Sequence, residues 1–172
     1  MQEITNREKA SEYLKIPKNR IFNFRKYRNN DWSYEDQYEY CHLFRKINNG
    51  YIELTKGIKT EWIFSYDNRD WEYKDENKYH HLFKEINGKW VELTRNVNAI
   101  DTFSYSNGDW SYQDKNKYWH LFRNINDEWV ELTEKVKAIA ICSYDNGDWI
   151  YKDKTDKWHL IKKINNKWVK FP

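Results

Sequence analysis

The same seven-residue pattern recurs along this chain at a fixed interval of 39 residues. It reads SYDNRDW at 65–71, SYSNGDW at 104–110 and SYDNGDW at 143–149, with a looser version, KYRNNDW, at 26–32. Ten positions are identical in all four copies, and no insertion separates the copies. A strict period of roughly 20 to 50 residues is typical of repeat architectures, in which each unit buries surface against its neighbours. The copies lie at about 23–58, 62–97, 101–136 and 140–172.

Each copy is predicted to form a meander of four short antiparallel strands. In copy 2, runs rich in Trp, Tyr, Phe, Ile and Val place the strands near 62–67, 70–75, 79–86 and 89–94. Two-residue hairpin turns need positive φ, which Asn, Gly and Asp tolerate best. The first predicted turns are Asn29-Asn30, Asn68-Arg69, Asn107-Gly108 and Asn146-Gly147. The second are Asn48-Asn49, Asn87-Gly88, Asn126-Asp127 and Asn165-Asn166.

These turns set the expected pairing of side chains. With Asn68-Arg69 as the first turn, Tyr66 lies opposite Trp71 and Phe64 opposite Tyr73, so that four aromatic rings share one face. With Asn87-Gly88 as the second turn, Leu82 lies opposite Leu93 and Lys84 opposite Val91.

Apolar residues on both faces of such a small sheet predict that the copies pack face to face. The fold class is therefore all-β, with four tandem four-stranded meanders in a single β-repeat domain over 20–172. The favoured arrangement is a four-bladed β-propeller-like ring, in which the segments TKGIKT, TRNVNA and TEKVKA cross from one copy to the next. The alternative is an open twisted β-repeat array, whose terminal copies need caps.

Residues 1–19 lie outside the repeat and predict a short helix. Thr5 followed by Glu8 matches a capping box, and the helix should run through Leu14 and stop before Pro17. This segment offers a structural cap or a dimer contact.

The composition argues against several partner classes. The 30 basic and 27 acidic residues are interspersed, with a net charge of +3, so the basic patch typical of nucleic-acid binding is missing. Aromatic rings interleaved with Lys keep base stacking as a third and weaker alternative. Cys41 and Cys142 occupy non-equivalent positions, which favours free thiols. The sequence shows no signal peptide or membrane span, so we expect a cytoplasmic protein without a membrane partner.

Both turns of a meander lie at the same end, where aromatic rings gather with Asn and Asp. Rings of this kind stack on sugars, and carboxylates and amides bond to hydroxyl groups. Tyr51 and Trp168 belong to the same rim. The candidate ligand-binding residues are Asp31, Trp32, Asp70, Trp71, Asp109, Trp110, Asp148, Trp149, Trp90 and Trp129. The structural alternative is that the tryptophans after the first turn are wedges between sheets and that the aspartates close the turn.

The histidines at the 39-residue interval suggest a metal site only if they face one axis. They belong to the third strand of each copy, which is remote from the axis of a propeller, so we expect half-buried residues that bond to a neighbour and no metal or cofactor. These residues are His42, His81, His120 and His159. The four carboxylates at the Asp36 position could take the same role on the same condition.

Every notable polar residue is repeated, whereas catalysis needs one asymmetric constellation. We therefore expect no enzyme but a non-catalytic, multivalent recognition module, with glycan as the favoured ligand. The alternative is a protein-interaction scaffold or inhibitor that binds a single protein partner through the aromatic surface. A lectin should keep its ligand-facing residues alike between copies, while a single-partner surface should let them diverge.

Overall fold

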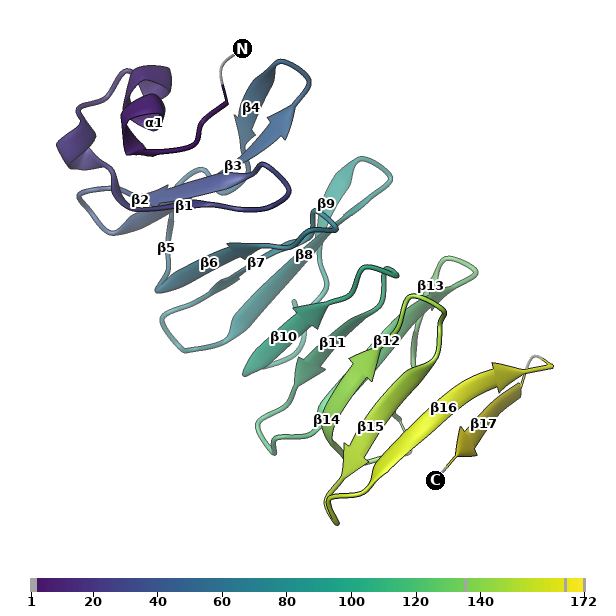
Figure 1. Cartoon of the computed structure of the whole chain (residues 1–172). Helices are drawn as coiled ribbons and strands as arrows, with labels where there is room; N and C mark the ends of the chain where they lie inside the picture. Colours follow the sequence, from purple (N-terminus) through teal and green to yellow (C-terminus); the bar gives the residue numbers. More distant parts are fainter. Residues whose placement is uncertain (1–2, 135, 166, 172) are drawn as a thin grey trace. The chain divides into compact units, whose positions relative to one another are not determined.

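The computed structural model describes residues 3–134, 136–165 and 167–171. Half of the chain, 50%, is in strands and 7% is helical, in three antiparallel sheets and one N-terminal helix (Figure 1). Asn166 of a predicted turn and Lys135 of a predicted crossing lie outside the described residues. Within the described ranges, no helix has the length and apolar character to cross a membrane.

The chain forms two compact units, and each is described by itself. Unit 1 contains the chain up to Lys78 together with Leu82–Val91, which is the N-terminal helix, copy 1 and most of copy 2. Unit 2 contains Tyr79–His81 and the chain from Glu92 onward, with copies 3 and 4. The single β-repeat domain over 20–172 stays a prediction.

Each copy forms the predicted meander of four strands. Copy 1 has β1 (Phe22–Lys26), β2 (Trp32–Glu35), β3 (Tyr40–Ile47) and β4 (Gly50–Glu53). Copy 2 has β6 (Trp62–Ser65), β7 (Trp71–Lys74), β8 (His80–Ile86) and β9 (Lys89–Glu92). Copy 3 has β10 (Asp101–Ser104), β11 (Trp110–Gln113), β12 (Trp119–Ile125) and β13 (Glu128–Glu131). Copy 4 has β14 (Ala138–Ser143), β15 (Trp149–Asp153), β16 (Trp158–Ile164) and β17 (Lys167–Phe171).

The first hairpin of each copy has a longer loop than its sequence predicts. The Tyr66 N–H donates to the Asp70 carbonyl at 2.9 Å, so three residues lie in the loop and Arg69 adopts a φ of 74°. A turn followed by one left-handed residue is a common three-residue hairpin loop. Ser65 is therefore paired with Trp71, and the predicted pairing of Tyr66 with Trp71 is wrong by one residue.

This shift separates the aromatic rings onto the two faces of the sheet. Tyr73 pairs with Ile63, and its ring shares a face with Trp71. Phe64 and Tyr66 lie on the opposite face, so the predicted four aromatics on one face are split two and two.

The second hairpin forms as predicted. Asn126 and Asp127 have φ values of 54° and 65°, and Ile125 pairs with Glu128 across this two-residue turn. Copy 1 has the same register, with Ile47 opposite Gly50. The equivalents of the predicted Lys84 to Val91 pairing therefore lie opposite each other.

The N-terminal helix, α1 (Arg7–Leu14), ends where predicted but has a different cap. Asn6 is the N-cap, and its side-chain oxygen accepts a hydrogen bond from the Lys9 N–H at 3.0 Å. The capping box beginning at Thr5 is therefore wrong. Glu8 lies in the first turn and pairs with Lys18 instead of reaching back to the cap.

Helix α1 covers one face of copy 1. That face carries Trp32, Tyr34 and Phe44, and we call it and its equivalents in other copies the tryptophan face. It forms a cluster with Ile4 and Ala10 of the N-terminal segment. Figure 1 shows α1 on one side of β1–β3 and strands β6–β8 on the other side. The N-terminal segment therefore covers the tryptophan face of copy 1.

The opposite face of copy 1 packs on copy 2. This face, called the tyrosine face with its equivalents, carries Tyr27, Cys41 and Leu43, which cluster with Ile63 and Trp71. The tyrosine face of one copy thus meets the tryptophan face of the next within unit 1. Face-to-face packing of copies 1 and 2 is confirmed there.

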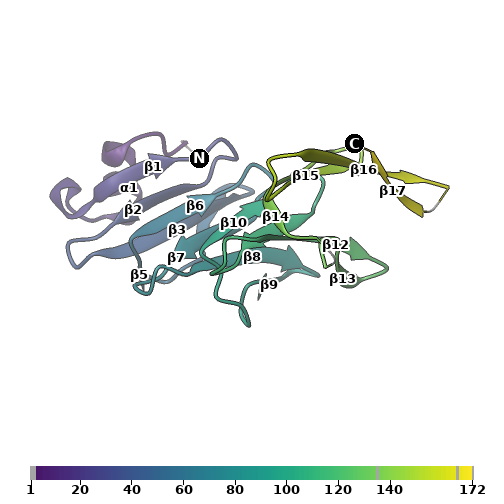
Figure 2. The ribbon, with the colours of Figure 1, turned by 90° about the horizontal axis from the view of Figure 1, so that it is seen from below.

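Unit 2 repeats this arrangement. Tyr105 and Leu121 of copy 3 cluster with Trp149, Tyr151 and Ile161 of copy 4. The segment that crosses from copy 3 to copy 4 first runs along copy 3. There Ala138, the first residue of β14, pairs with Trp119 of β12, so that β14 begins beside β12 (Figure 2). In unit 1, β5 (Ile58–Lys59) pairs with β3 in the same way.

Candidate binding surface

The tryptophans that follow the first turn are core residues. The exposed fraction is 0% for Trp32 and 4% for Trp71, Trp110 and Trp149. The Trp32 ring stacks on Phe44 with centroids 4.2 Å apart, and Trp71 and Trp110 stack on equivalent rings. The rings therefore offer no open face to a ligand, which agrees with the structural alternative. Their indole N–H groups have no hydrogen-bond partner among the described residues.

Hydrogen bonds to the aspartate of the same turn connect one copy to the next. Together with the bonds of the neighbouring asparagine, we call them the locking network. Both Asp31 and Arg45 are almost fully buried, and the Arg45 Nη2 donates to Asp31 Oδ2 at 2.9 Å. Ser65 of copy 2 donates to the same carboxylate oxygen at 2.7 Å. The Asn29 amide donates to the Ser65 hydroxyl and to the Tyr66 carbonyl, each at 2.7 Å. Burying this ion pair carries a desolvation cost, and removing one partner would leave the other charge buried and unpaired.

Copy 3 holds copy 4 with the same groups. Arg123 pairs with Asp109, and its Nη1 donates to the Gly147 carbonyl at 2.8 Å. The Asn107 amide donates to Ser143 Oγ at 2.8 Å. The turn aspartates of copies 1 and 3 are therefore occupied by packing contacts.

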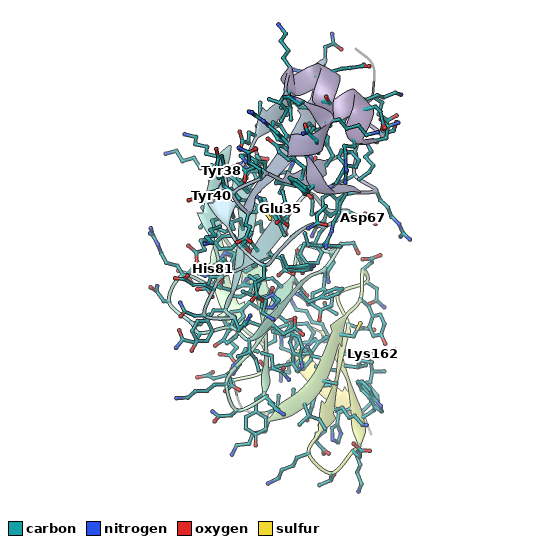
Figure 3. The ribbon with its side chains drawn as sticks, turned by 90° about the vertical axis from the view of Figure 1, so that its left-hand side faces the viewer. Glu35, Tyr38, Tyr40, Asp67, His81 and Lys162 are labelled. Carbon is teal, nitrogen blue, oxygen red and sulfur yellow. The ribbon has the colours of Figure 1, made fainter. Side chains whose placement is uncertain are left out.

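Copy 4 keeps this set of groups, but among the described residues of unit 2 no further copy packs on them. Lys162 stands 3.8 Å from Asp148, and 45% of the Lys162 side chain is exposed (Figure 3). The Asn146 amide donates to Asp148 alone among the described residues. Asp148 is thus the turn aspartate whose ion pair is the more exposed to solvent.

The tryptophans of the fourth strand are only partly buried. The Arg45 guanidinium lies 4.6 Å from the centre of the Trp90 ring, and Arg123 lies 5.3 Å from the centre of Trp168. Trp129 meets the edge of Trp110 with centroids 6.1 Å apart. These rings pack by one side and reach solvent by another, which suits a weak stacking site.

The histidines are half-buried, as predicted, and His42 and His159 bond to carboxylates of their own copy. His42 Nδ1 lies 2.7 Å from Glu53 Oε1, and the ring stacks on Tyr34 with centroids 4.7 Å apart. Burial alone lowers the His42 pKa, but the hydrogen bonds and charges of Glu53 and Asp36 outweigh it and raise the pKa. No cluster with the ligands of a metal site occurs among the described residues.

The Asp36 carboxylate closes the loop between the second and third strands. Its Oδ1 accepts the Tyr38 and Tyr40 N–H groups at 2.8 Å and 3.0 Å. Burial raises the Asp36 pKa, but these backbone bonds and His42 outweigh it and lower the pKa. Asp114 and Asp153 accept the equivalent bonds, so this series serves the turn.

The large exposed aromatics lie elsewhere. Tyr38 is 66% exposed and lies near Tyr40 and Glu35 at the surface of unit 1 (Figure 3). A cleft of about 330 Å³ beside them is lined by Glu35, Glu39, Glu61, Glu76, Lys59 and Thr60. In unit 2, Tyr144 and Trp158 are the most exposed rings of copy 4, at 42% and 49%.

Sequence reasoning missed the cations and serines of the locking network. Arg45 and Arg123 alternate with Lys at the 39-residue interval, and Ser65 and Ser143 recur without being present in copy 1. These positions are not identical in all four copies, so strict identity between copies does not mark them. One sequence pattern could have predicted the network: in every copy a basic residue follows the turn aspartate after 14 residues.

Burial also sets the ionisation of the interface between copies 1 and 2. It raises the pKa of Tyr27 to about 12, although the hydrogen bond to Ser33 opposes the shift. It raises the pKa of the Cys41 thiol to about 11. Both groups are therefore neutral at physiological pH and act as packing residues.

Comparison with known proteins supplies no family. The chain matches no protein-family model, and no curated protein matches its sequence. Function is therefore argued from the surface alone.

Proposed function

We propose that this chain is a non-catalytic recognition module that binds a protein partner through exposed aromatic side chains. One observation carries the proposal: the most exposed rings stand where the copies differ. Tyr38 is replaced by Asn77, Asn116 and Thr155 in the other copies. Trp158 is replaced by Cys41 in copy 1 and His80 in copy 2, and only copy 3 has the same residue, Trp119. A ligand bound four times over needs like residues in each copy, whereas one partner needs only one surface.

The chemistry of these rings also suits a protein partner. Tyr and Trp are enriched in protein interfaces and supply much of the binding energy there. The shared aromatic and charged residues of the repeat are engaged in stacking, turn closure and the locking network. This leaves the divergent residues for recognition, and the repeated polar groups for structure rather than for catalysis.

Glycan binding is the second candidate, favoured by the fourth-strand tryptophans. Trp90, Trp129 and Trp168 occupy equivalent positions and are partly exposed. Three like rings at equal intervals in the sequence would add avidity to weak stacking on sugars. This version of a lectin uses the fourth strand in place of the buried turn tryptophans.

For the order of the copies we propose the open array rather than the ring. A closed ring requires the tryptophan face of copy 1 to accept another copy, and α1 occupies that face through Ile4 and Ala10. An open array needs such a cap at its beginning.

The two functions separate in one set of binding experiments. Pull-down with the wild-type chain should recover one stoichiometric protein, and Trp158→Ala should reduce its capture at least tenfold. Trp129→Ala is the matched control and should not reduce it. A glycan array should remain negative; sugar binding that Trp129→Ala abolishes, with no protein recovered, would overturn the proposal in favour of the lectin. Capture that falls steeply with salt would instead indicate nucleic acid.

A further inference from the structure

We propose that the tyrosine face of copy 4 docks one further β-meander repeat, which another polypeptide supplies with its tryptophan face free. This inference rests on the proposed function, because it names the class of protein partner and the surface that binds it. It follows from the order of packing within each unit, where a tyrosine face always receives a tryptophan face.

The exposure of equivalent residues shows that this face lacks its neighbour. Tyr27 and Tyr105 are each 8% exposed, because the next copy covers them. Tyr144, at the same repeat position in copy 4, is 42% exposed. Trp158, which lies on the same face of the sheet, is 49% exposed, whereas its copy 3 equivalent, Trp119, is partly buried against copy 4. An aromatic face of this kind is typical of an interaction site.

The polar groups of the face identify what it would receive. In copy 1 the Tyr27 hydroxyl donates to the Ile63 carbonyl at 2.8 Å, and in copy 3 Tyr105 donates to Ile141 at 3.5 Å. The Tyr144 hydroxyl has no such acceptor among the described residues. It is therefore free to donate to a backbone carbonyl on the first strand of an incoming repeat.

Two further groups repeat this incomplete pattern. The Asn29 amide reaches a serine and a carbonyl of the next copy, whereas Asn146 bonds only to Asp148 within the described ranges. Arg123 donates to the loop carbonyl of Gly147, and Lys162 is the equivalent exposed cation in copy 4. The Tyr144 hydroxyl, the Asn146 amide and the Lys162 ammonium group can therefore donate to the same kinds of acceptor as their equivalents in copies 1 and 3.

These acceptors belong to a β repeat rather than to a helix. The carbonyls inside a helix are already bonded to its own N–H groups, so they cannot accept from all three donors. A first strand followed by a left-handed loop residue offers the Ile63, Tyr66 and Arg69 carbonyls in copy 2. A partner with Ser and Trp at the matching positions would complete both the polar network and the aromatic stack.

A second, unaltered copy of this chain is not the occupant. Its copy 1 tryptophan face is covered by α1, and the tryptophan faces of copies 2 and 4 are covered within their own units. Trp110, the equivalent residue of copy 3, is 4% exposed and is therefore not available either. The chain can nevertheless supply a test probe, because loosening α1 would free the face that carries Trp32.

The test uses the full chain with Ala10→Glu, since Ala10 is the completely buried residue of α1 and packs on the tryptophan face of copy 1. A buried charge at this site should lift the helix from the tryptophan face. Sedimentation should then show assemblies of at least twice the monomer mass of 21.5 kDa. Glu12→Ala, on the exposed side of the same helix, is the matched control and should remain monomeric, as should the wild type.

Adding Trp158→Asp to Ala10→Glu should restore the monomer. The proposal is overturned if Ala10→Glu keeps its β-sheet circular dichroism but stays monomeric, or if its assembly persists with Trp158→Asp. Self-association of the wild type that Trp158→Asp abolishes also overturns it, since a capped second copy would then be the occupant.

If Ala10→Glu does not fold, a chain extended by a fifth copy provides the test. Residues 133–171 are repeated after residue 171, and hydroxyl-radical labelling measures the reactivity of Trp158. The reactivity should fall at least threefold, but not when the added copy has Ala at the Trp149 position. Unchanged reactivity in the extended chain overturns the inference, while loss of partner capture in the pull-down would overturn only the proposed function.

Discussion

Replacing Leu121 by alanine tests the packing between copies. Leu121 is fully buried in the cluster formed by copies 3 and 4. Losing three buried carbons costs about 2.4 kcal/mol at about 0.8 kcal/mol for each. The cavity left between two sheets adds to this, which gives about 3 to 4 kcal/mol within the usual range for buried leucines.

Leu160→Ala is the matched control, because Leu160 holds the same position in copy 4 on the uncovered face. Its loss should cost less than about 1.5 kcal/mol, since no second sheet surrounds it. Hydrogen exchange of the β12 and β15 amides gives the local free energy of opening without assuming that both units unfold together. Equal losses in Leu121→Ala and Leu160→Ala would refute the reasoning that the next copy creates the core.

Three further predictions concern the ionisable groups. Asp31→Ala leaves the buried Arg45 unpaired and should lower the free energy of unfolding in urea by about 3 to 5 kcal/mol. Asp148→Ala removes a partly exposed pair and should lower it by less than about 1 kcal/mol. Equal losses in the two variants would contradict the role of the locking network. The raised pKa of His42 means that its stabilising contribution is complete below the ordinary value of 6.5 and is lost as pH rises through the raised value. His42→Gln should therefore destabilise the chain more at pH 5 than at pH 9, and a larger effect at pH 9 would show the wrong sign. Cys41, with its pKa raised to about 11, should react with iodoacetamide far more slowly at pH 8 than after unfolding in urea, and equal rates would contradict its burial.

The repeat made the secondary structure predictable because each copy had to satisfy the same turn chemistry. Asn126 and Asp127 tolerate positive φ, and the second turn formed at that pair. The first turn was misplaced because Arg69 also takes positive φ but as the last residue of a three-residue loop. An Asn-Gly-like pair alone does not distinguish these two loops, and one residue reverses the faces of a strand.

The candidate site was harder to predict because repetition preserves packing and binding residues alike. Trp71 recurs in every copy because each sheet needs a ring at its interface, not because four ligands are bound. The exposure of Trp158 depends on a neighbour that copy 4 does not have in its own unit, and no local sequence pattern encodes that absence. The repeat therefore predicted the strands and turns of each copy, whereas the proposed binding surface lies where the face of copy 4 is not covered by a neighbouring copy.

Hydroxyl-radical labelling of the tyrosine series, read by mass spectrometry, tests the central claim most directly. Tyr27, Tyr105 and Tyr144 have the same chemistry and the same repeat position, so their reactivities differ only through what covers them. The account predicts that Tyr144 is labelled severalfold faster than Tyr27 and Tyr105, in line with exposures of 42% against 8% and 8%. Equal labelling of the three rings would contradict stacking of the copies and the open face at copy 4.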